Sequence, residues 1–208
     1  MAMQDSSVAI AIMARAPVAG LCKTRLIPTI GAHAAAVLQE RLTECAVTTA
    51  CAAETGPVTL WCAGDPRHVS FRELEAKRHI TLRQQGDGDL GARMLAAMAA
   101  NAGPTLVIGS DCPALNAGNL RQAADALLGG ADVVLIPAED GGYVLIGALQ
   151  PRPELFEGMM WGTAAVLADT RERIAALGLA HVELVPLWDV DNADDLVRLE
   201  RELPEIAL

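Results

Sequence analysis

The chain has 208 residues, of which 52% are hydrophobic, 20% charged and 3% aromatic, and its formal net charge is −10. This composition excludes a disordered chain, and the length predicts a single domain over residues 1–208. The acidic balance argues against a nucleic-acid partner, because such binding relies on a basic face, although a small phosphorylated ligand needs only a local group of positive side chains.

Neither a membrane-spanning helix nor a secretory signal is expected near the start of the sequence. The apolar run Val8–Ala14 is much shorter than the roughly 20 residues of a spanning helix, and it follows Asp5, Ser6 and Ser7 rather than basic residues. The five cysteines are scattered and odd in number, which argues against a disulfide framework or a zinc site. We therefore expect a cytoplasmic protein with no membrane partner.

Apolar runs and helical spacings alternate along the chain. Apolar residues recur at helical intervals over 37–49, 90–98 and 166–177. The runs expected to form buried strands are Val8–Ala14, Val58–Cys62, Ile80–Arg83, Thr105–Gly109, Val133–Pro137, Tyr143–Ala148 and Val182–Leu187.

Cap residues mark where three of the helices should begin. Asp65 before Pro66 is a predicted N-cap, and so is Thr163. Asn192 with Asp195 forms the predicted cap region of a C-terminal helix.

The pattern of hydrophobicity predicts a sheet that is covered on both faces. The strand runs are continuously apolar rather than alternating, as in parallel sheets. The connection over 138–142 is too short for a parallel crossover, so one of the two strands beside it should run antiparallel to its neighbours or sit elsewhere in the sheet. We expect Thr105–Ile108 to lie centrally and to be nearly inaccessible.

In an open α/β sheet, ligands bind beyond the carboxyl ends of the strands, so the loops there are the candidate sites. The loop that follows the first strand carries Arg15, Lys23 and Arg25, whose side chains suit phosphate groups. It matches neither the Walker A loop nor the dinucleotide-binding glycine pattern. The alternative interpretation is a solvated basic loop.

A carboxylate follows the strand Thr105–Gly109. Asp111 precedes Cys112 and Pro113, and a carboxylate in this place suits Mg²⁺ or Mn²⁺, which also bind phosphate oxygens. Alternatively, Asp111 caps the turn. No histidine is placed by the sequence to activate Cys112 as a nucleophile.

Three further loops carry candidate residues. The adjacent glycines within Glu139–Tyr143 allow close approach of a ligand or make a tight turn. Asp189 and Asp191 can hold a cation from one side of an extended segment, or they form an acidic helix cap. The glycine-rich segment Gly86–Arg93 opens a helix and could cradle a base or sugar.

Taken in order, these loops resemble a bacterial family of uncharacterised GT-A-like proteins that are labelled glycosyltransferases or nucleotide-diphospho-sugar transferases. The resemblance runs from about residue 8 to 203 and is carried by the strings MARAPVAGLCKTRL, GDGDLGARM, VIGSDCPAL, PAEDGGYVLIG and LWDVDNADDL. The chain is more distantly similar to molybdenum-cofactor and 2-phospho-lactate guanylyltransferases. The resemblance implies a GT-A-like fold, a three-layer α/β/α sandwich around a mostly parallel, Rossmann-like sheet with one antiparallel strand.

The resemblance also implies roles for individual residues. Asp111 would be the leading ligand of Mg²⁺ or Mn²⁺, with Asp191, or alternatively Asp189, as the second, and Lys23 and Asp111 would be the catalytic pair. Lys23 and Arg25 would contact the phosphates of the nucleotide, and the loops that carry them and the segment Gly86–Arg93 add Arg15, Asp87, Gly91 and Arg93 as further nucleotide-binding candidates. The acceptor pocket would be lined by Asp140, Gly141, Gly142 and Tyr143.

The expected function is metal-dependent transfer from a nucleotide donor, either a nucleoside triphosphate or a nucleotide sugar, to a small-molecule acceptor. Nucleotidyl transfer to a small anionic acceptor is favoured by the basic first loop. Glycosyl transfer from a nucleotide-diphospho-sugar is the alternative, although Asp111 is followed by Cys-Pro rather than forming the D-x-D of many glycosyltransferases. A nucleotide-binding protein without turnover is the second alternative. The first loop lacks the Gly-Gly turn of the molybdenum-cofactor enzymes, which leaves the base open.

Overall fold

One mixed sheet organises the chain. The computed structural model describes residues 7–208. Residues 1–6 of the predicted domain, which include Asp5 and Ser6, lie outside the described residues. The strands in this part of the chain form a seven-stranded sheet in the order β3-β2-β1-β4-β6-β5-β7. Their bounds are β1 (Ala9–Arg15), β2 (Val58–Ala63), β3 (Thr81–Gln84), β4 (Thr105–Gly109), β5 (Val133–Pro137), β6 (Tyr143–Ala148) and β7 (His181–Glu183).

The sheet is mostly parallel with one reversed strand, as predicted. Strands β1 to β4 pair in parallel, and β7 is parallel to β5. Strand β6 is antiparallel to both of its neighbours, β4 and β5, because the connection over 138–142 is a tight turn. The segment Thr105–Ile108 lies in the fourth of the seven strands, and none of its residues exceeds 2% exposure.

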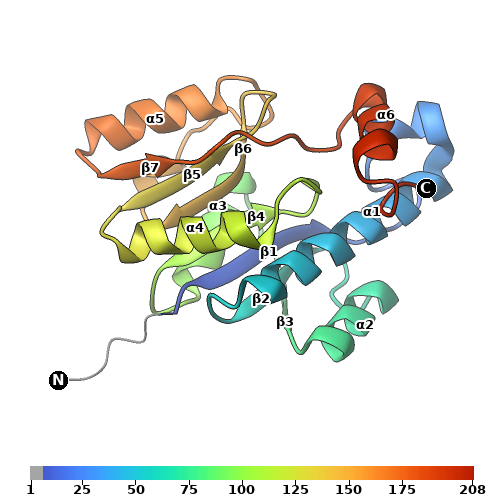
Figure 1. Ribbon diagram of the computed structural model, residues 1–208, viewed down its shortest axis with the longest axis horizontal. Coiled ribbons are helices and arrows are strands. Elements are labelled where there is room, and N and C mark those ends of the chain that lie inside the picture. The colour runs from blue at the N-terminus through green and yellow to red at the C-terminus, as the bar shows by residue number, and fades with distance from the viewer. Residues whose placement is uncertain (1–6) are drawn as a thin grey trace.

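Helices cover both faces of the sheet (Figure 1). Side chains of α1, α2 and α4 pack on one face, and those of α3 and α5 pack on the other. Within β1, Ile10 and Ile12 face the first group and Ala11 faces the second, which explains why the run is continuously apolar. The helix bounds are α1 (Ile27–Ala53), α2 (Val69–Arg78), α3 (Leu90–Ala99), α4 (Ala117–Leu128), α5 (Val166–Ala176) and α6 (Ala193–Glu202), with short 3-10 turns at η1 (Thr24–Leu26) and η2 (Pro153–Leu155).

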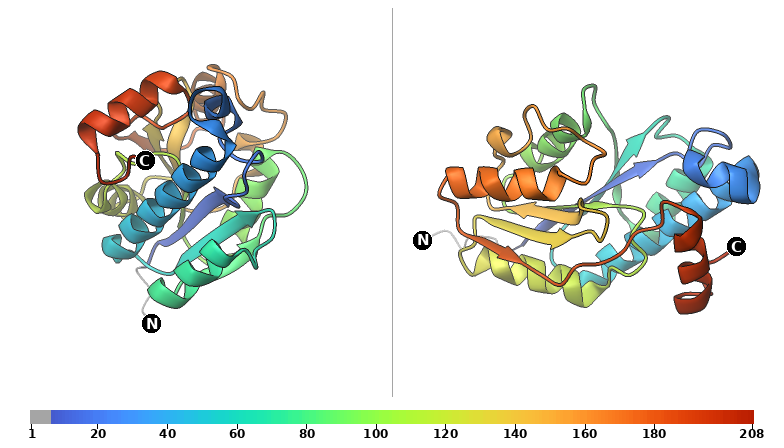
Figure 2. Two further views of the ribbon diagram at one scale, coloured as in Figure 1. Left: turned by 90° about the vertical axis from the view of Figure 1, so that its right-hand side faces the viewer. Right: turned by 90° about the horizontal axis from the view of Figure 1, so that it is seen from above.

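A third, smaller cluster lies beyond the end of the sheet. There α6 packs against the start of α1, as both views in Figure 2 show, and Trp188 and Val190 fill the space between the two helices. The helix α1 is kinked at Gly31, which has a φ of 79°. This cluster fixes the segment 188–191 against the loop that follows β1.

Three local predictions need correction. The last strand ends at Glu183 rather than Leu187, because Pro186 has no N–H for a ladder, and the segment returns only for a single bridge between Ala138 and Leu187. The helix α2 is capped by His68, whose Nδ1 accepts a hydrogen bond from the Ser70 N–H, and not by Asp65.

Asp65 instead accepts from the Arg67 N–H and closes the turn before α2. The N-cap of α5 is Ala165, because the Thr163 hydroxyl donates back to the Met160 carbonyl. The cap of α6 is confirmed, since Asn192 and Asp195 form a reciprocal capping box.

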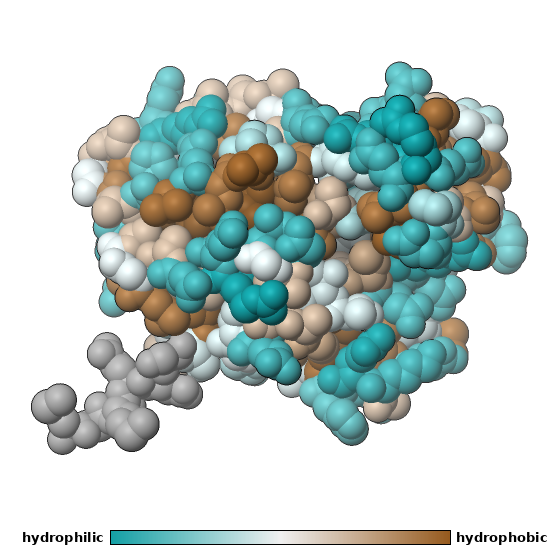
Figure 3. Space-filling view, viewed as in Figure 1, coloured by the Kyte–Doolittle hydropathy of each residue, from teal (hydrophilic) through white to brown (hydrophobic). Residues whose placement is uncertain are grey.

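Some large apolar side chains are exposed on the surface. On the face drawn in Figure 3, apolar side chains gather over β7 and the segment that follows it, where Val182 and Val185 are exposed. No helix within residues 7–208 is both long and apolar enough to cross a membrane.

Candidate functional site

The candidate site is a cleft at the carboxyl ends of β1 and β4. It has a volume of about 260 Å³. The residues that line it are Met13, Arg15, Lys23, Thr24, Arg25, Gln39, Ser110, Asp111 and Asp191. The tertiary structure therefore brings the predicted phosphate-binding cations together with both leading metal-ligand candidates.

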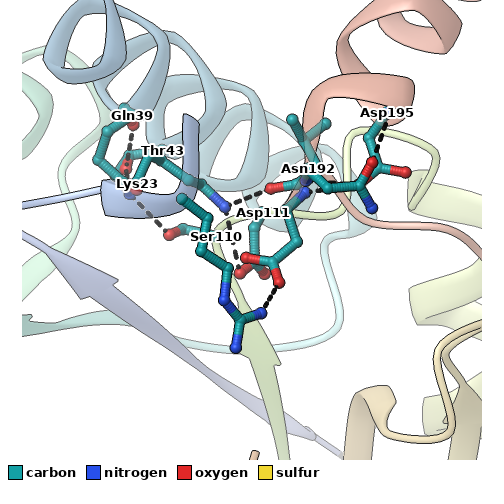
Figure 4. Close-up of polar contacts among 10 residues, drawn as sticks. Lys23, Gln39, Thr43, Ser110, Asp111, Asn192 and Asp195 are labelled. Atoms are coloured by element: carbon teal, nitrogen blue, oxygen red, sulfur yellow. Dashed lines mark hydrogen bonds and ion pairs between the residues drawn. The ribbon is translucent and has the colours of Figure 1, made fainter. Parts of the chain in front are cut away.

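Lys23 reaches into this cleft from the loop after β1. Its Nζ lies 3.5 Å from Asp111 Oδ2 and donates a 2.6 Å hydrogen bond to the Val190 carbonyl, and only 7% of its side chain is exposed (Figure 4). The backbone at Lys23 is left-handed, with a φ of 44°, which turns the chain into η1. Lys23 is therefore not part of a solvated loop, whereas the side chain of Arg25 is 71% exposed and pairs with Asp191.

Asp111 is held by its backbone and by a glycine beside it. The Val190 N–H donates to the Asp111 carbonyl at 2.9 Å, which ties the end of β4 to the segment before α6. A Cβ atom on Gly109 would lie 2.5 Å from Asp111 Oδ1. Glycine at position 109 therefore leaves room for the carboxylate in this orientation, and the Asp111 side chain is 44% exposed.

A buried polar network supports the floor of the cleft. Gln39 Nε2 donates to Ser110 Oγ and to Thr43 Oγ1, both at 3.1 Å, and all three residues are buried. The network fixes the residue before Asp111 against α1. The sequence interpretation missed Gln39, although a glutamine among the apolar positions of a core-facing helix is a signal that could have found it.

Asp191 lines the cleft but is already neutralised. Its carboxylate forms an ion pair with Arg25, and its N–H donates to Asp195 Oδ2 at 2.8 Å. The same capping box that starts α6 thus holds Asp191 in place.

Asp189 is a third carboxylate near the cleft. The pKa of Asp189 is raised to about 7, chiefly by burial and then by the negative charges of Asp111 and Asp140, whereas Lys23 acts in the opposite direction. The loops after β4, β5 and β7 therefore place carboxylates close enough to repel one another.

The donor set fits a hard divalent cation only if the nucleotide supplies further oxygens. Over residues 7–208, no three histidine, cysteine, aspartate or glutamate side chains converge as metal ligands. Mg²⁺ needs one or two protein carboxylates together with phosphate oxygens and waters. Asp111 with Asp191 or Asp189 meets that requirement, and the repulsion between Asp111 and Asp189 favours a cation beside them.

The predicted base-binding segment lies outside the cleft. Gly91 is buried, and a Cβ there would lie 2.6 Å from the Trp161 ring, so this glycine serves helix packing. Arg93 donates to Gln85 Oε1 at 3.3 Å. Gln85 in turn donates to the Trp61 carbonyl, and Asp87 is exposed. The segment therefore lies at the same edge of the sheet as the cleft, but beyond the ends of β2 and β3.

The predicted acceptor residues also lie outside the cleft. Asp140 Oδ1 accepts from the Gly142 N–H at 3.0 Å and closes the turn before β6. Gly141 has a φ of 95°, and a Cβ there would meet the Ala164 carbonyl at 2.4 Å. The Tyr143 hydroxyl is buried without a hydrogen-bond partner, and burial raises its pKa.

Comparison with known proteins gives one family. The sequence profile described as "Uncharacterized protein conserved in bacteria (DUF2064)" matches residues 46–163, a span that includes Asp111 and the turn over 139–143. A search of curated proteins finds no match.

Solved structures give the fold. The "putative nucleotide-diphospho-sugar transferase" of Desulfovibrio desulfuricans G20 superposes with a TM-score of 0.83 at 26% identity, over 94% of this chain and 88% of that one. The 4-diphosphocytidyl-2C-methyl-D-erythritol synthase of Anaerococcus prevotii has a TM-score of 0.65 at 12% identity, over 98% and 99% of the two chains. The glucosyl-3-phosphoglycerate synthase of Mycobacterium tuberculosis, solved with Mn²⁺ and uridine diphosphate, has a TM-score of 0.58 at 12% identity, over 96% and 78%. The GT-A-like fold is therefore confirmed.

Proposed function

We propose that this chain, which belongs to the bacterial family DUF2064, is a metal-dependent transferase that uses a nucleotide donor. One observation carries the proposal: Lys23, Arg25 and Asp111 line a single cleft at the carboxyl edge of the sheet. Positive side chains beside a carboxylate suit a metal-bound di- or triphosphate. Structures of the same fold that bear the names of transferases support it.

Nucleotidyl transfer to a small anionic acceptor is the reaction that the cleft favours. An acceptor oxygen attacks the α-phosphorus of a nucleoside triphosphate, the bond from that phosphorus to its bridging oxygen breaks, and pyrophosphate leaves with the electron pair. Lys23, which contacts the Val190 carbonyl and Asp111, would stabilise the negative charge that develops on the phosphates. Arg25, whose side chain is exposed, would bind the phosphate groups of the donor.

Asp111 with Asp191, or with Asp189 in its place, would hold the divalent cation. Bound Mg²⁺ or Mn²⁺ supplies Lewis-acid stabilisation of the phosphate oxygens. Arg25 would then exchange Asp191 for a phosphate group, because both partners offer the paired oxygens that a guanidinium prefers. The segment 86–93 extends the same edge and would receive the base or sugar, and the turn over 139–143 would face the acceptor.

Glycosyl transfer is the second candidate. It is favoured by the Desulfovibrio structure, whose name is that of a nucleotide-diphospho-sugar transferase and which superposes over most of both chains. In that reaction the donor would release a nucleoside diphosphate, and the same cations would stabilise it.

A donor screen separates the candidates. The wild-type protein is incubated with Mn²⁺, with each ribonucleoside triphosphate or nucleotide sugar, and with a panel of phosphorylated acceptors. Release of pyrophosphate supports nucleotidyl transfer, and release of a nucleoside diphosphate supports glycosyl transfer. Nucleotide binding without either product would leave the non-catalytic alternative, and absence of binding would reject the proposal.

A further inference from the structure

Arg198 of α6 makes contacts that its place on an outer helix does not require. Its guanidinium donates to both carboxylate oxygens of Glu139, at 2.8 Å and 3.3 Å, and to Glu202 at 3.3 Å. It also lies over the Trp188 ring, 4.6 Å from the ring centre. One side chain therefore joins α6 to the turn before β6 and to the segment that follows β7.

The two segments that Arg198 joins carry carboxylates in the adjacent positions. Glu139 precedes Asp140, and Trp188 precedes Asp189. The charges of Asp140 and Asp189 act on each other, so the two segments repel where they meet. Two backbone hydrogen bonds oppose this repulsion. The Glu139 N–H donates to the Leu187 carbonyl at 3.1 Å, and the Leu187 N–H donates to the Pro137 carbonyl at 3.0 Å.

An arginine side chain suits the joining of these two segments better than a lysine does. A guanidinium binds a carboxylate through two parallel hydrogen bonds and stacks on an aromatic ring at the same time, which an ammonium group does not do. Glu202, one turn further along α6, holds the guanidinium in the orientation that meets Glu139. The side chain is 32% exposed, so the pair is partly shielded from solvent.

We propose that Arg198 is a positioning residue for the cleft. By clamping Glu139 and covering Trp188, it fixes the turn over 138–142 to the segment 187–191, and so holds Asp140, Asp189 and Asp191 in register with Asp111. The inference rests on the proposed function because metal–nucleotide binding is what the register serves. Arg198 is not among the residues that line the cleft, and within residues 7–208 its hydrogen bonds go to Glu139 and Glu202.

The test compares two arginines with the same partner chemistry. Arg198→Ala removes the clamp, whereas Arg171→Ala removes a two-pronged ion pair to Glu183 at 2.7 Å, on α5 and away from the cleft. The measurement is Mn²⁺ affinity by electron paramagnetic resonance, in the presence of whichever ribonucleoside triphosphate the wild-type protein binds most tightly. Thermal unfolding reports stability for each variant.

We expect Mn²⁺ affinity to fall about 10-fold in Arg198→Ala, in the range for residues that orient metal ligands, and to stay unchanged in Arg171→Ala. A double-mutant cycle adds the readout that a merely structural role would not move. In the Glu139→Ala background, Arg198→Ala should lower Mn²⁺ affinity far less than in the wild type.

Each other outcome counts against the inference. Equal affinities in wild type and Arg198→Ala, or equal losses in both arginine variants, would show that Arg198 contributes stability alone. Additive losses in the cycle would show that it does not act through Glu139. If the wild-type protein binds no Mn²⁺ with any nucleotide, the proposed function itself fails, and that result is distinct because it precedes the comparison of variants.

Discussion

Lys23 Nζ lies 3.5 Å from Asp111 Oδ2, so in the ligand-free protein the buried cation of the first loop compensates the carboxylate that the fourth strand presents. A second pair, Arg25 with Asp191, repeats the arrangement across the cleft. Each cation would thus leave a carboxylate for a phosphate when a metal-bound nucleotide enters. These two ion pairs neutralise Asp111 and Asp191 and so limit the repulsion between their carboxylates.

Removing either cation should weaken nucleotide binding. We expect Lys23→Ala and Arg25→Ala each to reduce the affinity by about 1–3 kcal/mol, the range for charge-assisted hydrogen bonds, as measured by calorimetry with Mg²⁺ present. Arg67→Ala is the control, because it removes an exposed arginine that is also paired with an aspartate, Asp65, and neither residue lines the cleft. Unchanged affinity in both test variants would contradict the phosphate-binding role of the loop.

Neutralising Asp111 should remove the dependence on divalent cation. Asp111→Asn keeps the shape of the side chain, so the ligand-free protein should stay folded while nucleotide binding no longer responds to Mn²⁺. The measurement is a Mn²⁺ titration at fixed nucleotide concentration, and Cys112→Ala serves as a neighbouring control. Equal cation dependence in wild type and Asp111→Asn would exclude Asp111 from the metal site.

Asp189 should make the ligand-free protein less stable as pH rises. Its pKa is raised from 3.8 to about 7, so its contribution to stability is complete below about pH 4 and is lost as pH rises through 7. Asp189→Asn should therefore unfold with about 2–4 kcal/mol more free energy than wild type at pH 8, with a difference near zero at pH 4.

Urea unfolding at a series of pH values measures this difference. Asp125→Asn, which changes an exposed aspartate on α4, should follow the wild-type curve at every pH. A constant difference between Asp189→Asn and wild type from pH 4 to 8 would show that burial does not raise the pKa of Asp189.

Gly109→Ala should displace the Asp111 carboxylate. The new Cβ would lie 2.5 Å from Asp111 Oδ1, so the side chain must rotate away, and we expect Mn²⁺-dependent nucleotide binding to weaken about 10-fold. Gly103→Ala is the matched control, because its Cβ would meet nothing within 4 Å. Binding like that of wild type in Gly109→Ala would show that the observed orientation of Asp111 is not the one that binds metal.

The sheet and the loops at its carboxyl edge could be predicted from local sequence patterns. Runs such as Val133–Pro137 are apolar at every position because helices cover both faces of the sheet, and this pattern is visible without coordinates. The short connection over 138–142 likewise predicted that one of the two strands beside it is reversed or sits elsewhere in the sheet, and the structure shows that the reversed strand is β6. Since ligands bind beyond the carboxyl ends of strands, Lys23, Arg25 and Asp111 could be identified before their positions were known.

Only the tertiary structure decided how these groups meet. Gln39 supports Ser110 from 71 residues away, and Lys23 donates to Val190 across 167 residues, and no local pattern encodes such contacts. The burial of Lys23 and the raised pKa of Asp189 arise from neighbours on other loops. The sequence therefore determined which residues reach the edge of the sheet. The packing of α1 against α6 beyond that edge determined the partners of these residues. The physical reason is that desolvation and charge coupling depend on distances that only the folded chain sets.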